Sequence, residues 1–384
     1  MVKLVRITTV PISLKLLLQG QMSYMQEKGF DVTMISSDGD EIDEVTAYED
    51  CEHVIVPMTR SINIFMDLYS LIRLTWVLRR LKPDIVHTHT PKAGLLGMWA
   101  ALFAGVKIRL HTIAGLPFMT ATGAKRQLLI AVERLTYIPA KLVLPNSKSI
   151  YDYMVEKNLV SRRKLRMIGK GSSNGIDLNR YNNSQLDENL LTMIKSEINF
   201  SVQEFYFLVV GRMVKDKGIN EVISAFLEIS DEVNNVRLLL VGPFESVRED
   251  ENLSSKVKQV INDHRKITHI SWSNYVEYYM HISHVLIHAS HREGFPNVLL
   301  QAGSMNCPII CTQIPGNVDI VEDGVTGSLF DKENTQMLVS QLRSIINNYS
   351  GAKLLSSKLQ SKITQMFSRE YIHEEIYKLY REFV

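Results

Sequence analysis

The chain has 384 residues, of which 45% are hydrophobic and 22% charged, and its formal net charge is +2. This length is too great for one ordinary core, and with this composition it describes a globular protein of about two domains. The three cysteines, Cys51, Cys307 and Cys311, make no disulfide framework, and no Cys or His cluster has zinc-site spacing. We therefore expect a reduced protein without a structural metal.

The N-terminal stretch "MVKLVRITTV" has neither the apolar run nor the cleavage site of a signal peptide. The longest uncharged apolar stretch, residues 93–106, is shorter than the roughly 20 residues that span a bilayer. We therefore expect a cytoplasmic protein.

Charge is unevenly distributed, because residues 60–170 hold 19 Lys/Arg against 5 Asp/Glu. Such a basic segment can attract phosphates, nucleic acid or an anionic membrane, or can simply be a solvated surface. The chain shows no nucleic-acid recognition motif, so we expect no nucleic-acid partner.

In the first half, short runs typical of strands alternate with segments of helical length. A helix is predicted over 66–81, and Pro83 follows it as a stop signal. The predicted strands are 3–10, 31–37, 53–58, 84–90, 107–113 and 141–147.

The same alternation restarts after the irregular segment "GKGSSNGID" (169–177), which suits a boundary between domains. Two such series predict two doubly wound domains, each with a mostly parallel sheet that binds ligands at the carboxyl ends of its strands. The predicted strands are 204–211, 236–242, 267–272, 285–290, 308–313 and 326–330.

The first strand–helix turn of neither domain carries G-x-G-x-x-G or a Walker motif, which argues against a dinucleotide or NTPase site. The second domain opens instead with "VVGRMVKDKGINEVISAF" (209–226). Gly211 ends a strand, Arg212 follows it, and Lys217 precedes a helix. Two cations at a helix start can neutralise a diphosphate, although a basic turn alone is a common surface feature.

A second turn of interest is "HREGFPNVLLQAG" (291–303), which follows the strand 285–290. Pro296 suits the first turn of a helix, whose free N–H groups favour a phosphate. Glu293 lies just before that helix and Gln301 lies within it, so the two side chains can reach different parts of one ligand. Alternatively, Glu293 is only a charge that interacts with the helix dipole.

Together, "GRMVKDKG" and "EGFPNVLLQAG" resemble the retaining, family 4 glycosyltransferases of the GT-B fold. "DIVHTHTPKAGLLGM" (84–98) is similar to the subgroup that builds lipid-linked bacterial surface polysaccharides such as capsule or O-antigen. The resemblance implies two Rossmann-like domains facing across a cleft. It assigns 1–172 to an acceptor-binding domain and 173–365 to a nucleotide-sugar-binding domain. Residues 366–384 then form a helix that packs back on the first domain.

The resemblance also implies a donor site for a nucleotide sugar, with UDP-sugar expected. Arg212 and Lys217 would bind the diphosphate and stabilise the leaving group without a metal or other cofactor, and Glu293 would bind the sugar hydroxyls. The further donor contacts are Gly211, Gly294, Phe295, Pro296, Asn297 and Gln301. Relatives have a glutamate for the ribose where this chain has Gln301, which predicts weaker ribose binding and not lost chemistry.

For the acceptor, a polyprenyl-diphosphate-linked saccharide, relatives place a histidine where this chain has Ala114. His111 is the nearest substitute, as a catalytic or acceptor-side residue, and His89 is the next. Lys92 could meet an acceptor phosphate, and Ser13 could face the acceptor. The basic, amphipathic segment 125–141 predicts a peripheral position on the anionic inner face of the plasma membrane, unless its leucines pack on the sheet.

Two other functions remain open at this point. A nucleotide-sugar 2-epimerase shares the fold and would act on a UDP-sugar without an acceptor. A degenerate, non-catalytic nucleotide-sugar-binding module would bind the donor without transfer, and Ala114 and Gln301 are the residues that suggest it.

Overall fold

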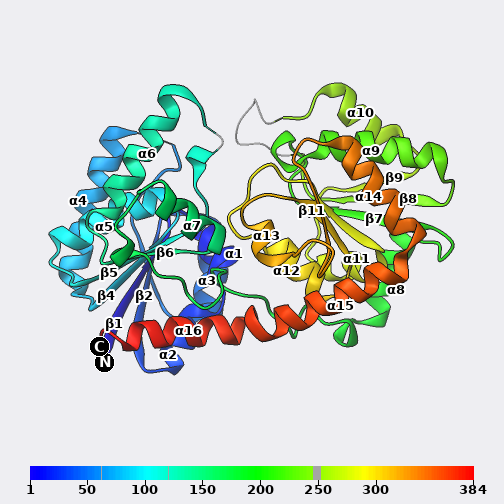
Figure 1. Ribbon diagram of the computed structural model, residues 1–384. Helices are drawn as coiled ribbons and strands as arrows, with labels where there is room; N and C mark the ends of the chain where they lie inside the picture. Colours follow the sequence, from blue (N-terminus) through cyan, green and yellow to red (C-terminus); the bar gives the residue numbers. More distant parts are fainter. Residues whose placement is uncertain (62, 120, 245–251) are drawn as a thin grey trace. The chain divides into compact units, whose positions relative to one another are not determined.

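The computed structural model describes all residues except 62, 120 and 245–251. The chain forms two compact units, each an α/β unit built on a sheet (Figure 1). Unit 1 contains Met1–Gly175 and Arg369–Val384, and unit 2 contains Ile176–Ser368. Over the residues described, no helix combines the length and apolar character needed to cross a bilayer.

Unit 1 is built on six parallel strands in the order β3-β2-β1-β4-β5-β6. The strands are β1 (Val2–Ile7), β2 (Phe30–Ser36), β3 (Glu52–Ile55), β4 (Ile85–His89), β5 (Ile108–Ile113) and β6 (Leu142–Pro145). The helices are α1 (Pro11–Leu17), α2 (Gln21–Glu27), α3 (Ile42–Glu49), α4 (Ile64–Leu81), α5 (Pro91–Phe103), α6 (Gly123–Tyr137), α7 (Lys148–Glu156) and α16 (Arg369–Arg381).

Both faces of this sheet are buried, because side chains alternate along each strand and helices cover both sides. Val5 and Ile7 point into the core beneath α4, α5 and α7, whereas Leu4 points into the core beneath α1, α2 and α16. Helix α5 lies close to the sheet, since a Cβ built on Gly94 would lie 2.3 Å from Cε1 of His111. Only a glycine permits that approach.

Helix α16, at the end of the chain, is part of unit 1. The hydroxyl of Tyr380 lies 2.6 Å from the buried Arg6 guanidinium of β1 and 2.6 Å from His87 Nδ1 of β4. Tyr24 of α2 donates to Glu374 at 2.7 Å. These contacts join α16 to the same face of the sheet as α2.

Unit 2 repeats the arrangement, with strand order β12-β11-β10-β7-β8-β9 and every pair parallel. The strands are β7 (Phe205–Val210), β8 (Val236–Val241), β9 (Ile267–Ile270), β10 (Val285–His288), β11 (Ile309–Thr312) and β12 (Ser328–Phe330). The helices are α8 (Glu188–Glu197), α9 (Ile219–Glu232), α10 (Ser255–Asp263), α11 (Val276–Ile282), α12 (Asn297–Ser304), α13 (Asn317–Ile320), α14 (Thr335–Asn347) and α15 (Tyr349–Met366).

Both sheets therefore follow one topology, in which the first and fourth strands of each unit lie side by side. These pairs are β1 with β4 and β7 with β10. Strand order reverses between them, and open α/β sheets bind ligands outside the carboxyl ends of strands at such a switch point. The predicted fold of two doubly wound α/β domains is confirmed.

Candidate active site

At the switch point of unit 2, the segment after β7 meets the loop after β10. Gly211 and Arg212 follow β7, a short 3-10 turn covers Lys215–Lys217, and Gly218 precedes α9. Gly218 has φ +67°, and a Cβ there would lie 2.1 Å from the carbonyl oxygen of Ala289. Glycine is required at this position for two reasons: its backbone conformation and the close approach of the two segments.

Glu293 of the loop after β10 forms an ion pair with Lys217. The same oxygen of Glu293 lies 3.2 Å from Nε2 of His288, the last residue of β10. Burial alone would raise the pKa of Glu293, but the positive charge of Lys217 and the contact with His288 hold it below its usual range. The carboxylate is therefore ionised at neutral pH, and its oxygens can only accept hydrogen bonds.

Two further pairs tie the same segments together. Arg292 Nη2 lies 3.0 Å from Oδ2 of Asp216, and His291 Nε2 lies 3.0 Å from Oε1 of Glu221. The hydrogen bond to Glu221 raises the pKa of His291. The backbone N–H of His291 donates to the carbonyl of Asp216 at 2.9 Å. Consecutive residues 291, 292 and 293 are thus each fixed to the turn that carries Lys217.

The other predicted donor contacts lie around this turn. Arg212 is half-buried next to Gly211, and Pro296 precedes Asn297, the first residue of α12. The ring of Phe295 is buried, and its centre lies 5.3 Å from that of the Phe367 ring. Its side chain serves the core of unit 2, so only the backbone of Phe295 and Gly294 is available to a ligand.

Gln301 lies in α12, and its amide NH₂ donates to the hydroxyl of Tyr181 at 2.7 Å. The amide therefore has a specific partner within unit 2 that uses its donor. A glutamate at this position could not donate, so Tyr181 would have to donate instead.

Over the described residues, no three or more His, Cys, Asp or Glu side chains are grouped so that they could hold a metal ion. The segments that meet at the switch point of unit 2 carry the cationic side chains Arg212, Lys215, Lys217 and Arg292. An anionic ligand is the chemistry that such a set suits.

In unit 1, the structure places the predicted acceptor histidines in the interior. His111 is only 2% exposed, its Nδ1 lies 2.8 Å from the hydroxyl of Thr88, and burial lowers its pKa to about 4. His89 is buried on the opposite face of the sheet, with Nε2 2.9 Å from Arg6. Both rings are buried, because helices cover both faces of the central strands.

Lys92 and Ser13 lie nearer to the carboxyl edge of that sheet. Lys92 Nζ lies 2.6 Å from both carboxylate oxygens of Asp67, so its charge already has a partner. Ser13 is half-buried in the first turn of α1. The structure does not bring these two residues together with His89 or His111 as one group.

A different pair occupies the switch point of unit 1. The hydroxyls of Thr9 and Thr90, which follow the ends of β1 and β4, lie 2.8 Å apart. Thr90 has φ 71° and ψ 147°, a conformation that a β-branched residue rarely adopts. Sequence reasoning missed Thr9, Thr90 and also His288. The signal available was their position at or just after the end of a predicted strand.

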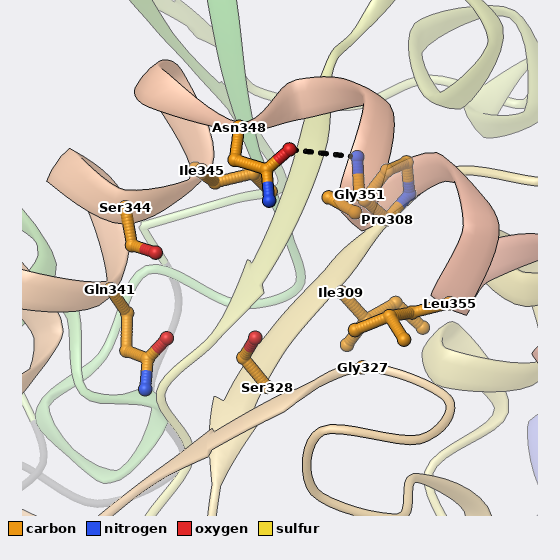
Figure 2. A pocket seen from close by; sticks show the side chains of 11 residues that line it. Pro308, Ile309, Gly327, Ser328, Gln341, Ser344, Ile345, Asn348, Gly351 and Leu355 are labelled. Carbon is orange, nitrogen blue, oxygen red and sulfur yellow. Dashed lines mark hydrogen bonds between the residues drawn. The ribbon is translucent and has the colours of Figure 1, made fainter.

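A pocket of about 230 Å³ in unit 2 lies elsewhere (Figure 2). Pro308 precedes β11 and Ser328 begins β12, so this pocket lies at the amino ends of the strands. Figure 2 shows the Asn348 side chain accepting from the backbone of Gly351 at its rim. It carries no charged side chain, and its end of the sheet is opposite to the switch point. We therefore do not assign the active site to it.

Comparison with known proteins agrees with this geometry. Residues 18–171 match the model of a glycosyl transferase 4-like domain, and residues 192–364 match that of glycosyl transferases group 1. The chain is 31% identical to the capsular polysaccharide biosynthesis glycosyltransferase CapM of Staphylococcus aureus, over 100% of this chain and 97% of CapM. The chain belongs to the family 4-type glycosyltransferases of the GT-B fold. This glycosyltransferase is also 24% identical to the UDP-Gal:alpha-D-GlcNAc-diphosphoundecaprenol alpha-1,3-galactosyltransferase of Escherichia coli, over 95% of this chain and 92% of the relative.

Solved structures show the same fold. A glycosyltransferase from Rickettsia africae superimposes with a TM-score of 0.82 at 18% identity, covering 100% of this chain and 98% of the other. Anabaena HepE in complex with UDP and glucose gives a TM-score of 0.81 at 15% identity, with 100% of both chains covered. The predictions of fold, family and enzyme class are confirmed.

Proposed function

We propose that this glycosyltransferase moves a sugar from a UDP-sugar to a polyprenyl-diphosphate-linked saccharide in the biosynthesis of capsular or lipid-linked polysaccharide, with retention at the anomeric carbon. Relatives with these names support the pathway and the acceptor class. The crystallised complexes of HepE with UDP and UDP-glucose support the donor class.

The observation that carries the proposal is the ion pair of Lys217 and Glu293, beside Arg212 at the switch point of unit 2. In the proposed complex, Arg212 and Lys217 bind the diphosphate and stabilise the negative charge that grows on it as the glycosidic bond breaks. Lys217 then exchanges part of its contact with Glu293 for a phosphate oxygen. The ionised Glu293 accepts hydrogen bonds from sugar hydroxyls.

Retention follows in this proposal from attack on the face that the diphosphate leaves. The acceptor hydroxyl gives its proton to the departing phosphate oxygen as its own oxygen bonds to the anomeric carbon. Unlike a retaining glycosidase, this route needs no carboxylate nucleophile. Glu293 already has Lys217 and His288 as partners, which suits a residue that binds and orients.

For the acceptor, we propose that unit 1 binds it at the carboxyl edge of its sheet. Thr90 replaces His111 and His89 in this proposal, because it is half-buried at the switch point whereas those histidines are buried. Thr9 is buried too, and its hydroxyl lies 2.8 Å from that of Thr90 and so helps to position it. Ser13 and Lys92 remain secondary candidates there. The lipid part of the acceptor requires that the enzyme works at a membrane surface.

The test is a panel of radiolabelled UDP-sugars incubated with enzyme and a bacterial lipid extract, scored for label in the lipid fraction. Arg212→Ala and Glu293→Ala should each remove most transfer while circular dichroism stays unchanged. Transfer should persist in EDTA, since side chains supply the cations. Normal turnover by both folded variants would refute the site assignment.

The same panel separates the alternatives raised by the sequence. An epimerase would convert a UDP-sugar into its epimer without any lipid. A degenerate module would bind a UDP-sugar with no transfer to any acceptor in the extract. Either result would overturn the proposal.

A further inference from the structure

Helix α4 is apolar on two opposite faces. Its inner face packs on the sheet through the buried Leu74, Val77 and Leu78. Its outer face carries six large side chains at helical spacing, with Phe65 87%, Ile72 60% and Trp76 53% exposed. The others are Ile64, Leu68 and Tyr69. A surface helix normally presents polar residues outward, so a contiguous apolar face of this kind marks an interaction site.

The apolar surface continues beyond α4. Helices α4, α5 and α6 lie side by side over the sheet of unit 1 (Figure 1). Between them is a groove of about 380 Å³, lined by side chains that include Leu68, Leu71, Leu96, Trp99, Phe103 and Leu135. The one charged residue at this groove, Asp67, is paired with Lys92.

The charge on this surface has one sign. Arg73, Arg79 and Arg80 are exposed on α4, and the guanidinium carbons of Arg73 and Arg80 lie 5.5 and 5.7 Å from the centre of the Trp76 ring. Asp67 is the sole acidic residue in the sequence of α4, and Lys92 neutralises it. The outer face is therefore apolar at its centre, basic at one end and free of uncompensated negative charge.

We propose that the outer face of α4, with the adjoining groove, docks on an anionic phospholipid bilayer. Tryptophan and tyrosine favour the boundary between headgroups and acyl chains, and arginines can reach up from it to phosphates. Arginine attraction to anionic lipid adds to the apolar term. A second copy of the chain fits less well, because a two-fold contact through this face would bring its arginines against each other.

The inference rests on the proposed function for its purpose, which is to bring the enzyme to a lipid-linked acceptor. It also assigns the membrane contact to a different helix from the one that the sequence suggested. Segment 125–141 was the predicted contact, and the structure leaves Leu128 and Leu135 of α6 exposed. The larger and more exposed set lies on α4, with α6 bordering the groove.

The test uses the full chain and flotation with vesicles of neutral phosphatidylcholine, with and without 30 mol% phosphatidylglycerol. The variant Ile72→Gln/Trp76→Gln removes two central apolar contacts. Its matched control is Leu354→Gln/Trp272→Gln, which makes the same exchange at side chains of unit 2 that are 68% and 67% exposed. Losing each contact should weaken partition about tenfold, since one such side chain contributes about 1.5 kcal/mol.

The control variant should bind anionic vesicles like the wild type. The variant Arg73→Gln/Arg80→Gln should bind anionic vesicles more weakly than the wild type, with a several-fold lower affinity for each charge removed. The reason is that each arginine contributes about 1 kcal/mol near an anionic surface. Wild-type binding should also fall at high salt. Quenching by brominated lipid should decrease when Trp76 is replaced by phenylalanine and stay unchanged when Trp272 is.

Equal binding by the wild type and Ile72→Gln/Trp76→Gln would overturn the inference, as would no binding of the wild type to anionic vesicles. A wild-type dimer that becomes monomeric with these substitutions would assign the face to a second copy. Transfer to a water-soluble, short-chain acceptor separates this question from the proposed function. Transfer to this soluble acceptor should be normal in the α4 variants. If the wild type binds vesicles but transfers no sugar to the soluble acceptor, the proposed function is refuted and the docking surface is not.

Discussion

The pair of Lys217 and Glu293 has two possible roles, holding the loop after β10 in place and binding donor, and three variants separate them. These are Lys217→Met, Glu293→Gln and the double variant. Each single change leaves one member of the pair without its partner. The double variant removes both charges and keeps side chains of similar volume.

The magnitudes follow from exposure. The side chains of Lys217 and Glu293 are 25% and 14% exposed, so the pair lies between a fully buried and a surface ion pair. Breaking a fully buried pair costs about 3–5 kcal/mol and an exposed one less than about 1, so we expect about 1–3 kcal/mol here. For a unit of this size that lowers Tm by roughly 3–8 °C. Lys217→Met should cost more than Glu293→Gln, because the stranded carboxylate is less able to reach water than the lysine.

The double variant should regain most of the lost stability, because no unpaired charge remains. Its transfer activity should not recover. Removing a group that stabilises transition-state charge typically lowers kcat about 10²–10³-fold, and neither methionine nor glutamine can replace these contacts.

The assay pairs urea unfolding, followed by tryptophan fluorescence, with transfer from a radiolabelled donor across a range of donor concentrations. Recovery of both stability and kcat/KM in the double variant would show that the pair is only structural. The proposed donor contacts of Lys217 and Glu293 would then be wrong.

Three further outcomes are expected. Gln301→Glu should change donor KM more than kcat, because it alters the proposed ribose contact and the bond to Tyr181; a tenfold change in kcat at constant KM would contradict this. Asp216→Asn should lower kcat/KM by freeing Arg292 beside Glu293, and the reversed pair Asp216→Arg/Arg292→Asp should recover part of it, which a simple surface role would not predict. Acid should destabilise unit 1, because burial lowers the pKa of His111 to about 4 in the folded protein, whereas it is 6.5 in the unfolded chain. The unfolded chain therefore binds the proton first, and the free energy of unfolding falls by about 3 kcal/mol as pH falls through that window. His111→Gln should flatten this slope in pH-dependent urea titrations, and an unchanged slope would argue against it.

The strands were predictable because their apolar runs are short and evenly separated by helical segments. All twelve predicted strands overlap observed ones, although several were predicted too long, such as 3–10 for β1, which ends at Ile7. The topology also follows, because parallel strands with helical crossovers leave few arrangements. The placement of Lys217 and Glu293 in segments that follow the carboxyl ends of strands was predictable for the same reason.

The direction and burial of side chains could not be obtained in the same way. His89 and His111 lie near strand ends in the sequence, but what covers each ring depends on tertiary packing. His111 lies against Gly94 of α5, and His89 lies against Arg6 of β1. The partner of Gln301, Tyr181, is 120 positions away in the chain. Periodicity likewise predicted a helix over 66–81. From the sequence alone, however, its second apolar face could equally pack in a core, and only the fold shows that this face is exposed.

The two units also suggest where the acceptor should be sought. They share one topology, and in each the polar groups that follow the first and fourth strands meet at the switch point. In unit 2 these groups carry charge for a diphosphate. In unit 1 they are the hydroxyls of Thr9 and Thr90, and Thr90 keeps a strained backbone that costs about 1–3 kcal/mol. Such strain persists where surrounding contacts fix it, and here it holds the Thr90 hydroxyl against Thr9. Because Thr90 is half-buried at this carboxyl edge whereas Thr9, His89 and His111 are buried, Thr90 is the better starting point for defining acceptor contacts.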